Sequence, residues 1–197
     1  MDRDDIEKLL TGEKKRELRV EYAIEGIIEP FTALALTKSA DYSDVKNILA
    51  EKYTKEHKLV YITLNASAKK LERDFKKYNI DTKNILFVDF TPSSGKSNPD
   101  NEKNVLYSGS PSNLTRGLIQ INNHLDSVLG EKSFVIFDSL STLTIYNEAQ
   151  DIERFLHMLM KKIEENKLSA IILSGDYDER ESMTRTVAHF FDRILRV

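Results

Sequence analysis

The sequence predicts one α/β domain, built on a mainly parallel β-sheet with helices on both faces. Apolar runs of strand length alternate with helical patterns along most of the chain, as in repeated right-handed crossovers. The strand-like runs contain few polar residues, which is typical of strands buried on both faces. The chain has 197 residues and shows no internal repeat or linker, so its length suits a single core.

Continuous apolar runs predict the strands, and apolar residues three and four apart predict the helices. Thr32 to Thr37 reads as the first buried strand, and Ser112 or Asn113 is positioned to cap the helix that starts at Leu114. The predicted strands are 32–37, 59–64, 84–90, 105–107, 133–137, 169–174 and 193–197. The predicted helices are 45–53, 71–78, 114–128, 152–163, the longest, and one around 183–187.

Residues 1–30 form a separate N-terminal segment in this reading, and residues 31–197 form the core domain. Residues 4–10 look like a short helix, while 18–24 fits either a strand or a helix, and Pro30 ends whatever precedes it. Residues 91–103 are rich in Ser, Pro, Gly and Asn and are expected to form a loop.

Composition narrows the function classes. The chain has no cysteine, which excludes disulfides, thiolate metal sites and cysteine nucleophiles. It contains no apolar run long enough for a membrane span, and its acidic start does not resemble a signal peptide. We therefore expect a soluble cytoplasmic protein that does not bind membranes. With 29 basic and 32 acidic residues, no overall field attracts nucleic acid, although a local basic patch stays possible.

Chemistry in parallel sheets sits at the carboxyl ends of the strands. The strand at 133–137 ends at Asp138, which is followed by Ser139. An apolar strand that delivers an aspartate is the Walker B arrangement, in which the carboxylate helps to hold Mg²⁺. The alternative is structural, with Asp138 and Ser139 capping the next turn.

The segment FVIFDSLSTLTIY, residues 134–146, resembles the Walker B region of the RecA superfamily, particularly its KaiC-like archaeal branch. The preceding SPSNLTRGLIQI, the following IERFLHMLM and the later IILSGD fit the same branch in the same order. The resemblance extends over residues 31–197 and rests on this order more than on any one motif. It implies a RecA-like fold and an ancestral ATP site.

The phosphate-binding loop that this resemblance implies is not matched. A GxxxxGKS/T motif would fall on Thr37 to Asp44, where Tyr42 stands at its second glycine and Ser43 at its lysine. The tyrosine would obstruct close backbone approach, and Asp41 and Asp44 would repel a polyphosphate. The structural alternative is that Ser43 or Asp44 caps the helix at 45–53.

Two further segments also depart from the motifs of an active ATPase. After the second strand, where relatives carry a carboxylate that acts on the attacking water, the chain has Asn65, a neutral amide that cannot accept that proton. Ser94 to Ser97 spells the GKS of a phosphate loop, but Phe90 stands where its first glycine should be. We read it as a surface loop, with anion contact through Lys96 as the alternative. The chain looks like a degenerate member.

The remaining polar residues give no recognisable site. The histidines lack metal-ligand spacing, and the serines lack the partners of a nucleophilic triad. An acidic group after the sixth predicted strand could hold a cation, but a solvated loop is the simpler reading. These residues are His57, His124, His157 and His189; Ser139, Ser141 and Ser174; and Asp176, Asp178, Glu179 and Glu181.

Three functions follow as hypotheses. The first is a non-catalytic, KaiC-like domain that needs no cofactor and acts in regulation or signalling by binding a protein partner or itself. The second is an ATP-binding protein or slow ATPase with Mg²⁺ at a non-standard phosphate site. The third, nucleic-acid binding, requires a basic face, of which the sequence shows only short clusters at 14–16 and 69–70. The ancestral nucleotide-site positions are Asp138, Ser139, Ser43, Asp44 and Lys38.

Overall fold

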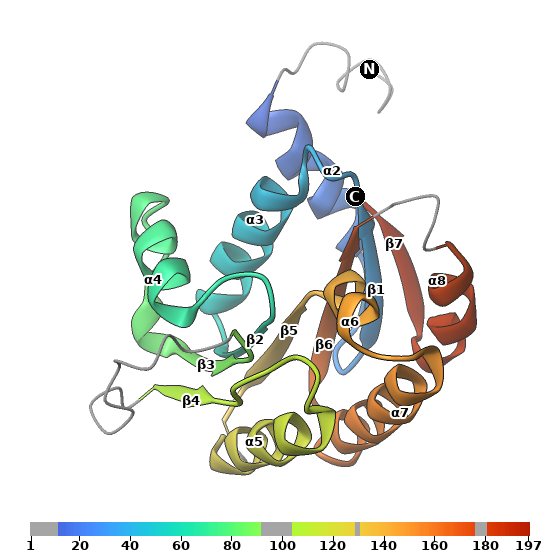
Figure 1. Ribbon diagram of the computed structural model, residues 1–197. Coiled ribbons are helices and arrows are strands. Elements are labelled where there is room, and N and C mark those ends of the chain that lie inside the picture. Colours follow the sequence, from blue (N-terminus) through green and yellow to red (C-terminus); the bar gives the residue numbers. More distant parts are fainter. Residues whose placement is uncertain (1–11, 92–103, 129–130, 176–180) are drawn as a thin grey trace.

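Parallel strands form the centre of the protein in the order β4–β3–β2–β5–β6–β1–β7. The computed structural model describes residues 12–91, 104–128, 131–175 and 181–197 (Figure 1). Each pair of neighbouring strands is parallel, so all the carboxyl ends lie at one edge of the sheet. In chain order the strands are β1 (Thr32–Thr37), β2 (Lys58–Thr63), β3 (Ile85–Asp89), β4 (Val105–Tyr107), β5 (Ser133–Asp138), β6 (Ser169–Gly175) and β7 (Arg193–Arg196).

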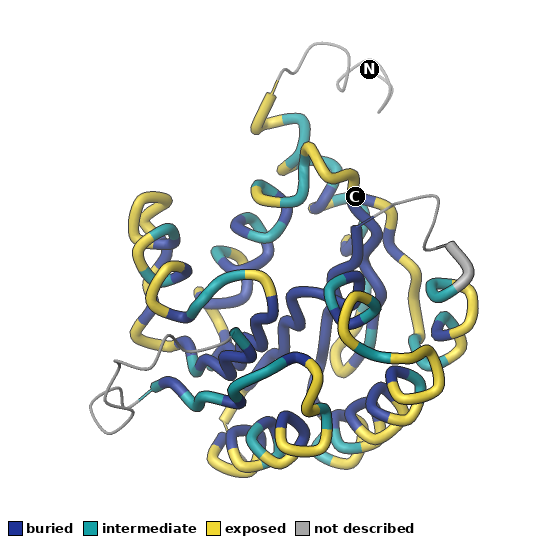
Figure 2. The backbone as a smooth tube through the Cα atoms, viewed as in Figure 1, coloured by how far each residue is buried: buried dark blue, intermediate teal, exposed yellow. Residues whose placement is uncertain are grey.

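Two layers of helices cover the sheet, because the strands are apolar on both faces. In β1, Ala33 and Ala35 pack with the first layer, whereas Leu34 and Leu36 pack with the second. The first layer contains α2 (Glu13–Ile24), α3 (Tyr42–Thr54) and α4 (Ala68–Lys77). The second contains α5 (Leu114–Ser127), α6 (Leu140–Tyr146), α7 (Ala149–Glu165) and α8 (Glu181–Val187). Figure 2 shows the buried strands between helices whose outer sides are exposed.

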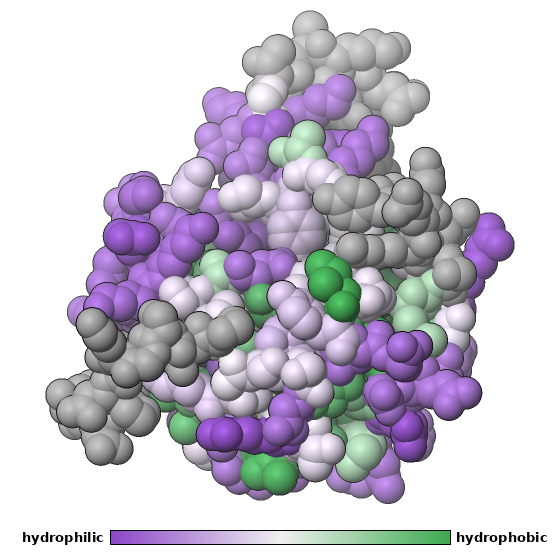
Figure 3. All heavy atoms as spheres, in the orientation of Figure 1, coloured by the Kyte–Doolittle hydropathy of each residue, from purple (hydrophilic) through white to green (hydrophobic). Residues whose placement is uncertain are grey.

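Figure 3 shows one face of the molecule with each residue coloured from hydrophilic to hydrophobic. Two short 3₁₀ helices, η1 (Thr82–Asn84) and η4 (Ala188–Phe190), connect longer elements. None of the described helices is both long enough and apolar enough to cross a bilayer.

The predicted fold class is confirmed, and all seven predicted strands are present with ends that differ by at most one residue. The ambiguous segment 18–24 belongs to helix α2, and Asn113 caps α5 by accepting a 3.0 Å hydrogen bond from the Arg116 N–H. Helix α6 was not predicted, because its seven residues LSTLTIY are too short and too rich in Thr and Ser for a clear helical period. The predicted helix at 4–10 lies outside the described residues, and the division at residue 30 stays a prediction.

Candidate functional site

The centre of the carboxyl edge is occupied by one buried carboxylate. Asp138 is the last residue of β5, which lies between β2 and β6, and this residue is 1% exposed. A buried carboxylate is stable only when hydrogen bonds replace the water that it has lost. The position that the sequence singled out is therefore a buried site with specific partners.

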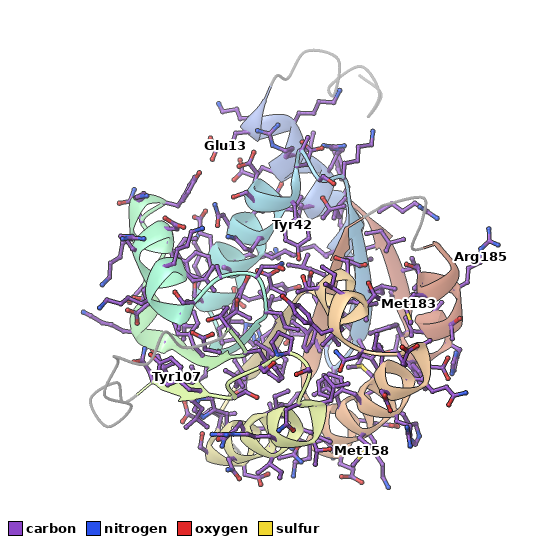
Figure 4. The ribbon with its side chains drawn as sticks, in the orientation of Figure 1. Glu13, Tyr42, Tyr107, Met158, Met183 and Arg185 are labelled. Atoms are coloured by element: carbon purple, nitrogen blue, oxygen red, sulfur yellow. The ribbon has the colours of Figure 1, made fainter. Side chains whose placement is uncertain are left out.

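Three neutral side chains supply those hydrogen bonds. The Tyr42 hydroxyl and the Asn65 amide donate to Oδ1 of Asp138 at 2.6 and 2.7 Å. The Tyr61 hydroxyl donates to Oδ2 at 2.8 Å. Tyr42 starts α3, Tyr61 lies within β2 and Asn65 follows β2, so the carboxylate joins two crossovers to the central strand. Figure 4 labels Tyr42 on α3, near the middle of the view.

Both tyrosines are held in the protonated form that can donate. Burial raises the pKa of Tyr42 well above its usual value, and the negative charge of Asp138 raises it further. Burial and the same carboxylate raise the pKa of Tyr61. At neutral pH these hydroxyls therefore keep their protons and point them at Asp138, rather than acting as bases.

A group of hydroxyls extends this network from Ser139. The Ser139 hydroxyl lies 3.1 Å from those of Ser141 and Thr142 and accepts from the Asn65 amide at 3.3 Å. Thr142 also donates to the Asn65 carbonyl oxygen, and the Gly175 N–H donates to Ser141 at 3.2 Å. Asp138 and Ser139 are joined by a cis peptide bond. The hydroxyls thus connect the ends of β2, β5 and β6.

The alternative prediction, in which Asp138 and Ser139 cap the turn that follows β5, was wrong for both side chains. Ser139 stands at the N-cap position of α6, but its side chain makes no capping hydrogen bond to the helix backbone. Asp138 bonds to Tyr42, Tyr61 and Asn65 instead. Both side chains form hydrogen bonds that join different elements of the fold.

The connection between β1 and α3 is too short for a phosphate-binding loop. Strand β1 ends at Thr37 and α3 begins at Tyr42, so the connection consists of residues 38–41. Lys38 is exposed, and so is Ser43 in the first turn of the helix. The prediction that Ser43 or Asp44 caps this helix was wrong, because the helix starts earlier and its N-cap position is Asp41, without a side-chain cap.

Carboxylates and arginines occupy the amino end of α3. Asp41 pairs with Arg19 of α2 at 2.9 Å and with Arg16 at 3.5 Å, and Arg16 also pairs with Asp44 at 2.5 Å. A helix N-terminus attracts anions, and here the chain's own aspartates lie there. Helix α2 is attached to the site through these ion pairs.

The structure therefore brings together only part of the predicted set. Asp138 and Ser139 are in contact with one network, through Asn65. Within the described part of the chain, no hydrogen bond or ion pair joins Lys38, Ser43 or Asp44 to Asp138. Sequence reasoning noted Tyr42 as an obstruction and Asn65 as a missing base, but it missed that both bind Asp138. Tyr61 gave no signal, since a tyrosine in a buried strand is ordinarily a packing residue.

A second buried carboxylate at the same edge has a structural role that the sequence did not show. Asp89 ends β3 and accepts from the Ala68 N–H, the first of α4, at 2.8 Å. Its other oxygen accepts from the backbone and hydroxyl of Thr91 at 2.8 and 2.6 Å. Asp89 thus satisfies an orphan donor at the start of α4, as a capping side chain would.

The described residues do not form a metal centre. No group of three or more histidines and carboxylates among them is placed to hold a metal ion. His57 pairs with Glu29 at 3.1 Å, and His124 contacts the Phe87 carbonyl at 3.2 Å. Asp176, Asp178 and Glu179, and the segment from Ser94 to Ser97 with Lys96, lie outside the described residues. The side chain of Glu181 does too.

The hydrogen bond between Tyr42 and Asp138 leaves no room for Mg²⁺ between their two oxygens. Two oxygens that share one magnesium ion are separated by at least roughly 2.9 Å, given bonds of about 2.05 Å. The Tyr42 and Asp138 oxygens are 2.6 Å apart, a direct hydrogen bond with no ion between them. The Asp138 side chain, which would face Mg²⁺ in a P-loop ATPase, already accepts hydrogen bonds from Tyr42, Tyr61 and Asn65.

The family to which the chain belongs is shown by a match to a family model. The model for a family of unknown function, DUF7504, matches residues 39–197, which include every described strand except β1 and every described helix except α2. The chain belongs to this family. No curated protein matches the sequence.

Two solved structures share the fold of this DUF7504 member. One is an uncharacterized protein, PH0321 from Pyrococcus horikoshii, in complex with an unknown peptide. It has a TM-score of 0.65 and 14% identity, over 90% of this chain and 81% of the other. The second is a type III secretion system ATPase from pathogenic bacteria, with a TM-score of 0.58 and 11% identity over 89% of this chain. The chain spans only 54% of that ATPase. The fold is therefore RecA-like.

Proposed function

We propose that this chain is a non-catalytic, KaiC-like RecA-fold domain that acts in the cytoplasm, in regulation or signalling, by binding a protein partner or another copy of itself. The observation that carries the proposal is the set of neutral donors on Asp138. The carboxylate that serves Mg²⁺ in a P-loop ATPase is bound by Tyr42, Tyr61 and Asn65. In this proposal the ancestral catalytic position has become part of the framework of the fold.

The amino end of α3 supports the same conclusion. A phosphate loop offers backbone N–H groups and a lysine, whereas this connection offers Asp41 and Asp44, which are paired with Arg16 and Arg19. Like charges 4 Å apart repel by about 1 kcal/mol in water and by several times more near a protein surface. A triphosphate would have to displace these aspartates.

Two features favour a protein partner. PH0321, which shares the fold, was crystallised with an unknown peptide. In the present chain, several large apolar side chains on the layer formed by α5, α6 and α7 are exposed. They are Ile119, Ile145, Tyr146 and Met158, each at least 51% exposed.

Titration calorimetry with ATP and Mg²⁺ tests the proposal on the full chain and on Asp138→Ala. We expect no binding heat at millimolar nucleotide for either protein. Micromolar binding by the wild type that disappears in Asp138→Ala would overturn the proposal and place a magnesium-dependent site at this carboxylate.

The alternative is an ATP-binding protein or slow ATPase with a phosphate site built from Lys38, Ser43, Lys96 and Asp138. Its support is the exposure of Lys38 and Ser43, which leaves both side chains accessible to an anion. Binding lost in Lys38→Ala but retained in Asp138→Ala would favour a phosphate contact without the magnesium carboxylate.

A further inference from the structure

Helix α4 carries all its basic residues on one side. An α-helix turns by about 100° per residue, so these five residues fall within an arc of about 120°. That arc lies opposite the buried residues Ala68, Leu71 and Phe75. We name it the basic face; it consists of Lys69, Lys70, Arg73, Lys76 and Lys77, all exposed. Figure 3 shows hydrophilic side chains over this helix, at the left of the view.

Most of this charge is not neutralised. Lys77 pairs with Asp74 at 3.0 Å, while the other four members form no ion pair within the described residues. Lys77, Lys46 and Lys70 together lower the pKa of Asp74. Glu72, on the opposite flank of the face, accepts a hydrogen bond from Asn104 at 3.3 Å. The helix therefore presents excess positive charge to solvent.

The face is held rigidly by the packing beneath it. Leu71 and Phe75 are fully buried against the sheet, and the Phe75 ring contacts Tyr61 edge-on with centroids 5.5 Å apart. Asp89 and Ser67 fix the first turn through the N–H groups of Ala68 and Lys70. A rigid row of cations loses little backbone entropy when it binds.

We infer that the basic face of α4 docks an acidic segment of a protein partner, an inference that rests on the proposed function and names the chemistry of that partner. The helix from Ala68 to Lys77 has five basic and two acidic residues, so it carries +3. The whole chain carries −3, which leaves −6 for the rest. A short acidic segment can therefore contact the positive helix without also contacting the negatively charged remainder.

The same balance disfavours a nucleic-acid strand. Ten helical residues span about 15 Å, the length of four to five extended residues. A longer polyanion would run beyond the helix onto the acidic remainder, within the screening length of about 8 Å at physiological salt. Strand binding also needs a groove that follows the backbone, whereas Glu72 and Asp74 flank this face.

Fluorescence anisotropy of a labelled pentaglutamate peptide, which matches the length of the helix, tests the inference. We compare the wild type with Lys69→Glu/Arg73→Glu, which reverses the centre of the face. Lys14→Glu/Lys52→Glu is the matched control, because it makes the same charge change at exposed residues of α2 and α3. We expect at least tenfold weaker binding for the first variant, less than twofold for the control, and loss of affinity from 50 to 300 mM salt.

Equal weakening in both double variants, or no measurable peptide binding by the wild type, would overturn the inference. Tighter binding of a six-nucleotide single strand, with five phosphates, than of pentaglutamate would assign the face to nucleic acid and also overturn it. Circular dichroism confirms that each variant is folded. Failure here leaves the nucleotide calorimetry unaffected, so this inference and the proposed function are tested separately.

Discussion

The Tyr42 hydroxyl donates a 2.6 Å hydrogen bond to Oδ1 of Asp138 and joins the start of α3 to the end of the central strand β5. In a P-loop ATPase these two places face each other across Mg²⁺ and phosphate. Here they touch directly. On the proposal that the chain is a non-catalytic RecA-fold domain, this contact accounts for an aspartate at the end of the central strand without a phosphate loop beside it.

Removing the Tyr42 hydroxyl measures how much this contact stabilises the fold. Hydrogen bonds to charged groups contribute about 1.5–3 kcal/mol, so Tyr42→Phe should lower the free energy of unfolding by about that amount. Urea denaturation followed by circular dichroism gives the value. The control is Tyr146→Phe at a 51% exposed residue, where the change should stay within about 0.5 kcal/mol. If both substitutions lower the free energy of unfolding equally, the hydrogen bond from Tyr42 to Asp138 stabilises the fold no more than an exposed hydroxyl does.

The close approach of α5 to the sheet depends on Gly117. A Cβ atom at this position would lie 2.2 Å from two ring atoms of Phe90, which is fully buried. Helix propensity alone favours Gly117→Ala by about 1 kcal/mol. We expect the overlap to prevail and the variant to lose about 1–3 kcal/mol of stability.

A double-mutant cycle with Phe90→Leu isolates this clash. The smaller side chain should make Gly117→Ala less costly than it is in the wild-type background. If Gly117→Ala stabilises the protein in thermal unfolding, or if its cost is the same in both backgrounds, the packing account of α5 is wrong.

His124 makes stability depend on pH on the acid side. Burial lowers its pKa below the usual 6.5, and a hydrogen bond from the ring to the Phe87 carbonyl opposes that shift. Below pH 6.5 the unfolded chain binds a proton that the folded chain resists, so stability falls as pH falls, by at most about 1.4 kcal/mol per unit. Urea unfolding at pH 7.5, 6.5 and 5.5 should show a shallower loss for His124→Gln. Parallel pH profiles would contradict this.

The ion pair between Arg19 and Asp41 ties α2 to the amino end of α3. Both side chains are partly buried, at 27% and 16% exposure, and their charged atoms are 2.9 Å apart. A double-mutant cycle with Arg19→Ala and Asp41→Ala should give a coupling energy of about 1 kcal/mol that decreases in high salt. A coupling near zero at low salt would mean that this pair does not hold α2, which leaves the packing of Val20 and Ile24 and the ion pairs of Arg16.

The sequence was sufficient for the sheet, because long apolar runs such as 133–137 have few alternatives to a buried strand. It also singled out Asp138 and Ser139, which share one hydrogen-bond network at the carboxyl edge. It could not show that Tyr61 and Tyr42 converge on Asp138, since that contact depends on which strands are neighbours. The capping prediction at Ser43 and Asp44 failed because the apolar pattern starts at Val45, whereas the helix itself begins at Tyr42, a residue bonded to Asp138.

The basic face of α4 shows the same limit. The cluster at Lys69 and Lys70 was visible in the sequence, but its meaning depended on which side of the helix is buried. Only the packing of Leu71 and Phe75 places the basic residues together and outward. A net charge of −3 conceals such a local surface.

We propose that Asp138 stabilises the fold and does not hold Mg²⁺ and nucleotide. The most direct measurement is the free energy of unfolding of the wild type and Asp138→Asn, each with and without 5 mM Mg²⁺–ATP. We expect Asp138→Asn to lower the free energy of unfolding by on the order of 2 kcal/mol, because its amide N–H groups cannot accept from the surrounding donors. We expect Mg²⁺–ATP to leave the free energy of unfolding of both proteins unchanged. A wild type stabilised by about 2.7 kcal/mol, the value for ligand at a hundred times its Kd, together with an unresponsive Asp138→Asn, would contradict the account.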